Sequence, residues 1–83
     1  MNATFSVLRV YALWNHNPSF TIPKIAAMLR DPPLKTSTVA TYILDAIRFE
    51  KLPFEKDRLK TVLQMIPESR TMWRYKGLWK MVE

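Results

Sequence analysis

The stretch that decides the fold runs from Phe20 to Phe49, and its sequence is FTIPKIAAMLRDPPLKTSTVATYILDAIRF. Thr21 is a favourable N-cap, and Pro23 is tolerated in a first helical turn because an N–H there has no helical partner to lose. Apolar residues follow at the helical spacing i, i+3, i+4 and i+7: Ile22, Ile25, Ala26 and Leu29. We therefore predict a short helix that ends by Arg30, since Asp31-Pro32-Pro33 cannot continue it.

A second, longer helix is predicted after this break. Thr36 or Ser37 is the expected N-cap, and the helix should end near Glu50, before Leu52-Pro53. Its apolar residues form one stripe, which we expect to face the core: Val39, Tyr42, Ile43, Ala46 and Ile47. Leu34, in the connection, is expected to pack beneath the two helices. A short helix, a tight break and a longer helix is the order of elements in a helix-turn-helix.

Three further helices are predicted around this unit. The first, Ala3–Trp14, is apolar nearly all round and should therefore be covered on more than one side. The next, Phe54–Ile66, carries a clean apolar stripe, and its charged start, Glu55–Arg58, is expected to lie at the surface. The last is Glu68–Val82, with a short strand at Met72–Tyr75 as the alternative. We predict a single all-α domain of all 83 residues, with four to five helices built around the helix-turn-helix.

Composition limits the class of protein. Thirteen Lys and Arg against seven Asp and Glu give a net charge of +6, which favours polyanionic partners such as DNA or RNA. The chain is 48% hydrophobic, which is too apolar for a disordered protein, yet no apolar run is long enough to span a membrane. The absence of cysteine fits a reducing compartment, and no signal-peptide pattern is present, so we expect an intracellular location in cytoplasm, nucleus or organelle matrix.

The start of the longer helix is the first candidate site. It offers a cation and three hydroxyls in succession: Lys35, Thr36, Ser37 and Thr38. Hydroxyls and backbone N–H groups at a helix N-terminus can bind phosphate, helped by the helix dipole. Thr41 and Arg48 are expected further along the outward face, where Asp45 would oppose deep insertion into a groove of nucleic acid. The alternative is that these hydroxyls only cap the helix.

The second candidate site is the basic C-terminal segment. Four cations, Arg70, Arg74, Lys76 and Lys80, alternate with three aromatic residues, Trp73, Tyr75 and Trp79. Aromatic rings can stack on unpaired bases while cations neutralise phosphates. The alternative is that the tryptophans close the core over the first helix, which needs a second cover.

The central residues also resemble a known family. Thr21-Ile22-Pro23-Lys24-Ile25-Ala26, followed by Leu34-Lys35-Thr36-Ser37-Thr38-Val39-Ala40-Thr41-Tyr42-Ile43, is similar to helix-turn-helix domains. The order of elements from Phe5 to Ile66 resembles the accessory helix-turn-helix at the C-terminus of RecQ-type and Werner-type helicases. This resemblance implies nucleic-acid binding, or docking, by a module attached to a larger enzyme.

These patterns predict a non-catalytic nucleic-acid-binding module, with DNA favoured over RNA, that captures the phosphate backbone. The alternative is a protein docking or assembly module on the same scaffold, with some aromatic side chains exposed as a partner surface. Either could belong to a larger helicase, nuclease or assembly. No catalytic residue, cofactor or metal site is predicted, because His16 has no second His and no Cys to share a zinc ion with. Gly77, the only glycine, cannot form a glycine-rich phosphate loop.

Overall fold

The computed structural model describes residues 4–29 and 34–83, and these residues form helices and no strand. The prediction of a small all-α domain is therefore confirmed. The break at Asp31-Pro32-Pro33 lies outside the described residues, as does Arg30, and the helix before them ends at Met28. In chain order the elements are α1 (Phe5–His16), α2 (Ile22–Met28), α3 (Thr36–Glu50), α4 (Lys56–Gln64), the 3-10 turns η1 (Ser69–Thr71) and η2 (Trp73–Tyr75), and α5 (Lys76–Val82).

The first turns of α2 and α3 are stabilised differently. The Thr21 side chain caps α2, as predicted, by accepting a hydrogen bond of 3.3 Å from a backbone N–H three residues later. α3 begins one or two residues earlier than expected, with Lys35 at the N-cap position and no capping hydrogen bond from its side chain. The prediction that Thr36 or Ser37 caps α3 is therefore wrong. Leu34 packs against the core, as expected, and the chain enters the helix directly after it.

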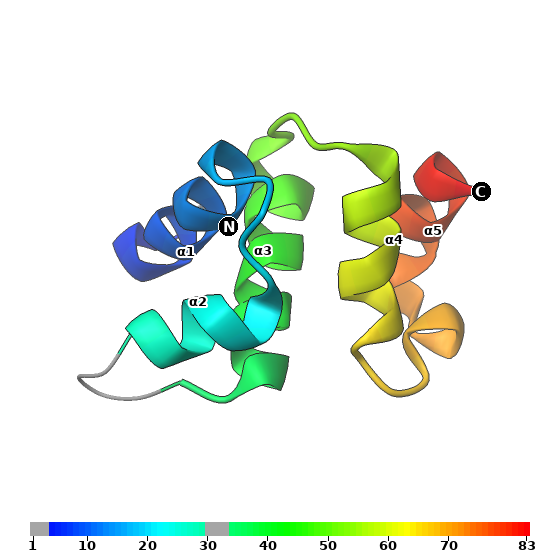
Figure 1. Ribbon diagram of the computed structural model, residues 1–83. Coiled ribbons are helices and arrows are strands. Elements are labelled where there is room, and N and C mark those ends of the chain that lie inside the picture. Colours follow the sequence, from blue (N-terminus) through cyan, green and yellow to red (C-terminus); the bar gives the residue numbers. More distant parts are fainter. Residues whose placement is uncertain (1–3, 30–33) are drawn as a thin grey trace.

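α3 is the central element of the fold, with α1 and α2 on one side and α4, backed by α5, on the other (Figure 1). Its buried residues are Val39, Ala40, Ile43, Leu44, Ala46 and Ile47. The single predicted stripe was too narrow, because a helix enclosed on two sides also buries Ala40 and Leu44. Tyr42, which belongs to the predicted stripe, is only partly buried.

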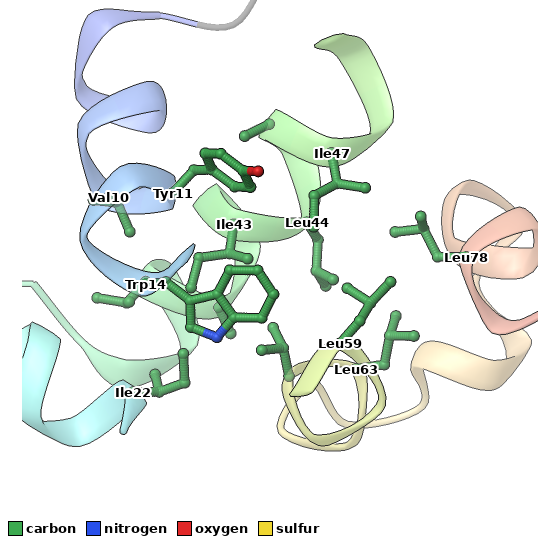
Figure 2. Packing of buried hydrophobic residues seen from close by; sticks show 14 of the residues in the cluster. Val10, Tyr11, Trp14, Ile22, Ile43, Leu44, Ile47, Leu59, Leu63 and Leu78 are labelled. Carbon is green, nitrogen blue, oxygen red and sulfur yellow. The ribbon is translucent and has the colours of Figure 1, made fainter. Parts of the chain in front are cut away.

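Side chains fill the core on both sides of α3. Figure 2 shows Trp14 beside Ile22 and Ile43 on the α1 and α2 side, whereas Leu44 points toward Leu59 of α4. All five side chains are buried and belong to one cluster. The two sides are therefore parts of a single hydrophobic core that passes through α3.

α1 is covered on one face, contrary to the prediction of a helix enclosed on several sides. It also extends past Trp14 to His16, while Phe5 is 82% exposed and Leu8 is 36% exposed. The second cover is missing because the C-terminal segment packs mainly against α4. Tyr11 links α1 to the connection between α3 and α4, since its hydroxyl donates a hydrogen bond to the Pro53 carbonyl oxygen.

The C-terminal segment is neither the single helix predicted over Glu68–Val82 nor the alternative strand at Met72–Tyr75. Glu68 adopts a left-handed conformation with φ of 62°, and Met72 is extended with ψ of 124°. Each residue interrupts a continuous α-helix, because neither conformation belongs to one. The chain therefore forms two 3-10 turns before it enters α5.

Ser69 fixes this segment to α4 and α5. Its side chain is buried, its hydroxyl donates a hydrogen bond of 2.7 Å to the Leu63 carbonyl oxygen, and it accepts one of 3.2 Å from Trp79 Nε1. If the Ser69 hydroxyl is removed, the Leu63 carbonyl oxygen and Trp79 Nε1 each lose the hydrogen bond that they make with it.

Replacing Ser69 with alanine is therefore expected to destabilise the domain by about 1–2 kcal/mol, since unsatisfied buried polar groups carry a desolvation cost. Urea denaturation followed by circular dichroism measures the change. The matched control is Ser19→Ala in the exposed connection between α1 and α2, which should alter stability by less than about 0.5 kcal/mol. Equal stability of the two variants would contradict an anchoring role for Ser69.

Candidate functional site

The predicted site residues fall into two groups, one at the start of α3 and one divided between the end of α3 and the C-terminal segment. The first, called here the α3 amino cluster, consists of Lys35, Thr36, Ser37, Thr38 and Thr41. The second contains Arg48 and the C-terminal cations Arg70, Arg74, Lys76 and Lys80. Lys35 and Arg48 are about 20 Å apart along the axis, given a rise of about 1.5 Å per residue. The structure therefore does not bring Lys35 and Arg48 together.

The α3 amino cluster presents polar groups to solvent in its first turn. Lys35, Thr36 and Ser37 are exposed, while Thr38 and Thr41 are half-buried. No side chain at the N-cap accepts a hydrogen bond from the first N–H groups of α3, in contrast to the threonine caps of α1 and α2. These N–H groups point out of the helix end and carry the positive end of its dipole. The arrangement suits an anion, with Lys35 beside it.

Arg48 does not extend the α3 amino cluster toward the other end of the helix. Its guanidinium forms an ion pair of 3.0 Å with Asp45. It also lies over the rings of Phe49 and Tyr75, at 4.7 and 5.7 Å from their centroids. The side chain is only 22% exposed. Arg48 therefore faces η2, and the outward face of α3 that we expected to run from Thr41 to Arg48 is half-covered along its length.

A hollow of about 350 Å³ lies beside the start of α3, between that helix and α1. Ser6 and Arg9 of α1 line it together with Leu34 and Tyr42. Arg9 is exposed, so it adds a cation to the lining of this hollow. Arg9 was not among the predicted site residues, although it is the only Lys, Arg, Asp or Glu in α1. A single charged residue among mostly apolar neighbours was the available signal for an exposed position on α1.

The four C-terminal cations have different environments. Arg70 pairs with Glu83 and lies over the ring of Trp79, 4.0 Å from its centroid. Lys76 and Lys80 are exposed one turn apart on α5. Arg74 is also exposed and lies 5.7 Å from the ring centroid of Tyr75. Arg74, Lys76 and Lys80 are therefore open to solvent, whereas Arg70 is held in a local contact.

The aromatic residues of this segment divide between core and surface. Tyr75 and Trp79 are buried, so the expectation of an aromatic nucleic-acid surface is wrong for these two rings. The alternative, a core role, is right for Trp79, but the surface it covers belongs to α4 and η1 rather than to α1. Trp73 is 85% exposed. It is the one ring of this segment that a partner can reach.

Trp73 stands at the edge of a groove of about 610 Å³, called here the α5 groove. Its lining is mainly apolar and includes Leu52, Phe54, Leu78 and Met81. The lining residues come from the end of α3, the connection to α4, η2 and α5. These segments are distant in sequence, so no local pattern could have predicted the groove.

Three cations line the α5 groove: Arg48, Lys51 and Arg74. Among the residues that the structure describes, no acidic residue lines it. Lys51 was not among the predicted site residues. It is the C-cap of α3 and has a left-handed backbone, with φ of 51°. It lines the groove together with residues of η2 and α5, which are distant in sequence.

Metal binding and membrane spanning are two further possibilities to consider for the described residues. Between residues 4 and 29 and from 34 onward, no three His, Asp or Glu side chains gather where they could hold a metal ion. No helix in the same part of the chain has the length and apolar character needed to cross a membrane. Comparison of this chain with family models, with curated proteins and with solved structures finds no match.

Proposed function

We propose that this domain binds nucleic acid without catalysing a reaction, by holding the phosphate backbone at the start of α3. DNA is favoured over RNA because the sequence resembles DNA-associated helix-turn-helix modules. The net charge of +6 supplies the long-range attraction for a polyanion. The packing of α2 against α3 supports the helix-turn-helix interpretation, in which the second helix approaches the nucleic acid.

One observation carries this proposal: the amino end of α3 is exposed, lacks a side-chain cap and has Lys35 at its N-cap position. The N–H groups of the first turn and the hydroxyls of Thr36 and Ser37 can donate hydrogen bonds to phosphate oxygens. Arg9, beside the neighbouring hollow, adds a second cation on the α1 side. Lys35 attracts the phosphate by its charge, and the N–H groups orient the phosphate through directional hydrogen bonds.

The burial of α3 also indicates how the domain binds. Beyond the first turn its outward side chains are half-buried, and Thr41 donates its hydroxyl proton to the Ser37 carbonyl oxygen at 2.9 Å. A helix that is half-covered in this way cannot enter a major groove over its full length. The contacts are therefore expected mainly at the phosphate backbone, with little discrimination between base sequences.

Fluorescence anisotropy with labelled 20-mers of duplex DNA, single-stranded DNA and RNA tests this function at about 50 and 200 mM salt. Affinity should fall steeply with salt, because each neutralised phosphate releases counterions. Lys35→Ala should weaken binding to all sequences alike and reduce the slope of log affinity against log salt by about 1. Lys56→Ala removes the same charge from an exposed position at the start of α4 and is the matched control.

Two outcomes of the titration would contradict the proposal. The absence of binding to all three nucleic acids at low salt would remove the function altogether. Equal losses for Lys35→Ala and Lys56→Ala would show that only net charge matters, not the start of α3. A double variant, Arg74→Ala with Lys76→Ala, locates the interface on the C-terminal segment if it alone abolishes binding.

A further inference from the structure

The α5 groove combines an apolar surface with exposed side chains that a folded monomer ordinarily covers. Trp73 is 85% exposed and Met81 is 47% exposed, and both line the groove. A volume of about 610 Å³ lies within the range of sites that bury a drug-sized ligand, so several apolar side chains of a partner can enter. Large exposed apolar residues that gather at one groove mark an interaction site.

The charges around the groove indicate which sign of charge the partner carries. Arg48, Lys51 and Arg74 line it, and none of the acidic residues within 4–29 and 34–83 does. Arg48 is already neutralised in part by Asp45, whereas Lys51 and Arg74 are exposed to solvent. Complementary charge across an interface increases the association rate and selects among partners. The partner is therefore expected to carry Asp or Glu beside its apolar residues.

We propose that the α5 groove docks an acidic amphipathic helix of another protein. The apolar face of such a helix, with large residues at i, i+3, i+4 and i+7, would lie on Leu52, Leu78 and Met81. Its acidic residues would meet Lys51 and Arg74 at the edge. Trp73 would close over one side of the bound helix as an aromatic anchor. This inference does not rest on the proposed nucleic-acid binding, since the α3 amino cluster lies at the other end of α3.

The lining favours a peptide over a strand of nucleic acid. Unpaired bases are held by stacking on aromatic faces, and successive bases need successive rings. The groove offers the exposed ring of Trp73 and the half-buried ring of Phe54, while the rest of its apolar lining is aliphatic. Leucine and methionine side chains instead pack against an amphipathic helix, and methionine adapts to its shape.

The test uses a labelled, synthetic 18-residue helical peptide, with Leu and Phe along one face and Glu and Asp beside them. A scrambled peptide of the same composition, which lacks the apolar face, is its control. Anisotropy titrations with the full chain should show the amphipathic peptide binding at least about tenfold more tightly than the scrambled one. Equal affinities would overturn the proposal.

Variants of the chain place the peptide in the groove. Trp73→Ala should weaken peptide binding at least about tenfold, while Leu8→Ala, at an exposed apolar position on α1, should not. Arg74→Glu should weaken it more than Lys76→Glu, because Lys76 does not line the groove. Circular dichroism confirms that each variant folds. If Trp73→Ala weakens binding to single-stranded DNA and not to the peptide, the groove holds a nucleic-acid strand and the proposal is wrong.

Discussion

Replacing Trp14 with alanine is expected to destabilise the domain by about 3–5 kcal/mol, the largest effect we expect from a single substitution. A domain of 83 residues has a total stability of about 4–12 kcal/mol at typical values per residue. The loss is therefore at least about a quarter of the free energy of unfolding. The variant should unfold at a much lower urea concentration than the unmodified chain.

The position of Trp14 explains this size. The indole is 2% exposed and lies beside Ile22 and Ile43, where α1, α2 and α3 meet (Figure 2). Its ring is tilted against that of Tyr11, with centroids 6.1 Å apart, and the Arg58 guanidinium lies 4.4 Å from it. Truncation would leave a cavity that three separate helices cannot close, because each is held by its own packing.

Urea denaturation monitored by circular dichroism at 222 nm measures the effect without relying on tryptophan fluorescence. Trp73→Ala is the matched control, since the same atoms are removed from a ring that is 85% exposed. That control should change stability by less than about 0.5 kcal/mol. A loss below about 1 kcal/mol for Trp14→Ala would mean that the core does not depend on this ring in the way the packing indicates.

Local sequence signals predicted the parts of the fold that depend on neighbouring residues. The Thr21 cap of α2 is found in the structure. Of the stripe predicted at Leu59, Val62, Leu63 and Ile66, the first three residues are buried and Ile66 is partly buried. Both signals need only a few nearby positions. The same reasoning located the core face of α3. It could not find the second buried face of that helix, which exists only because α4 packs there.

The C-terminal segment shows why local patterns were insufficient. Met72, Tyr75 and Trp79 recur at helical spacing, and the two aromatic rings are buried, yet the predicted segment is not a single helix. The interruption at Met72 lets Ser69 reach the Leu63 carbonyl oxygen and the Trp79 indole. These are tertiary hydrogen bonds, and a periodicity of apolar residues contains no information about them.

The candidate sites also divide into features that the local sequence predicts and features that depend on tertiary packing. The exposed start of α3 follows from the polar run at Lys35–Ser37, and its exposure agrees with the prediction. The outward direction expected of Arg48 was wrong, because η2 brings Tyr75 within reach of its guanidinium. The α5 groove joins the end of α3 to Trp73 and Met81, so it depends on how distant segments pack.

Arg58 was expected at the surface as part of the charged start of a helix, but its guanidinium reaches across to the chain that follows α1. It donates hydrogen bonds to the carbonyl oxygens of Trp14 at 2.6 Å and Phe20 at 3.2 Å. The same guanidinium also lies over the Trp14 ring. Burial lowers the pKa of this guanidinium, and the nearby Glu55 carboxylate opposes the shift. The charge also lies near the C-terminal end of α1, where the helix dipole favours a cation.

Arg58→Met is therefore expected to destabilise the domain by about 2–4 kcal/mol, because it keeps most of the side-chain volume and leaves two carbonyl groups without their charged donor. Arg58→Lys should recover only part of this loss, since one ammonium cannot reproduce the planar fork that contacts both oxygens and the ring. Lys56→Met, at an exposed position on the same helix, is the control and should stay within about 0.5 kcal/mol of the unmodified chain.

The three variants are compared by urea denaturation at pH 7. If Arg58→Met and Lys56→Met unfold at the same urea concentration, the contacts of Arg58 contribute nothing to stability. If the lysine variant matches arginine, the charge near α1 is sufficient and the fork geometry is not required.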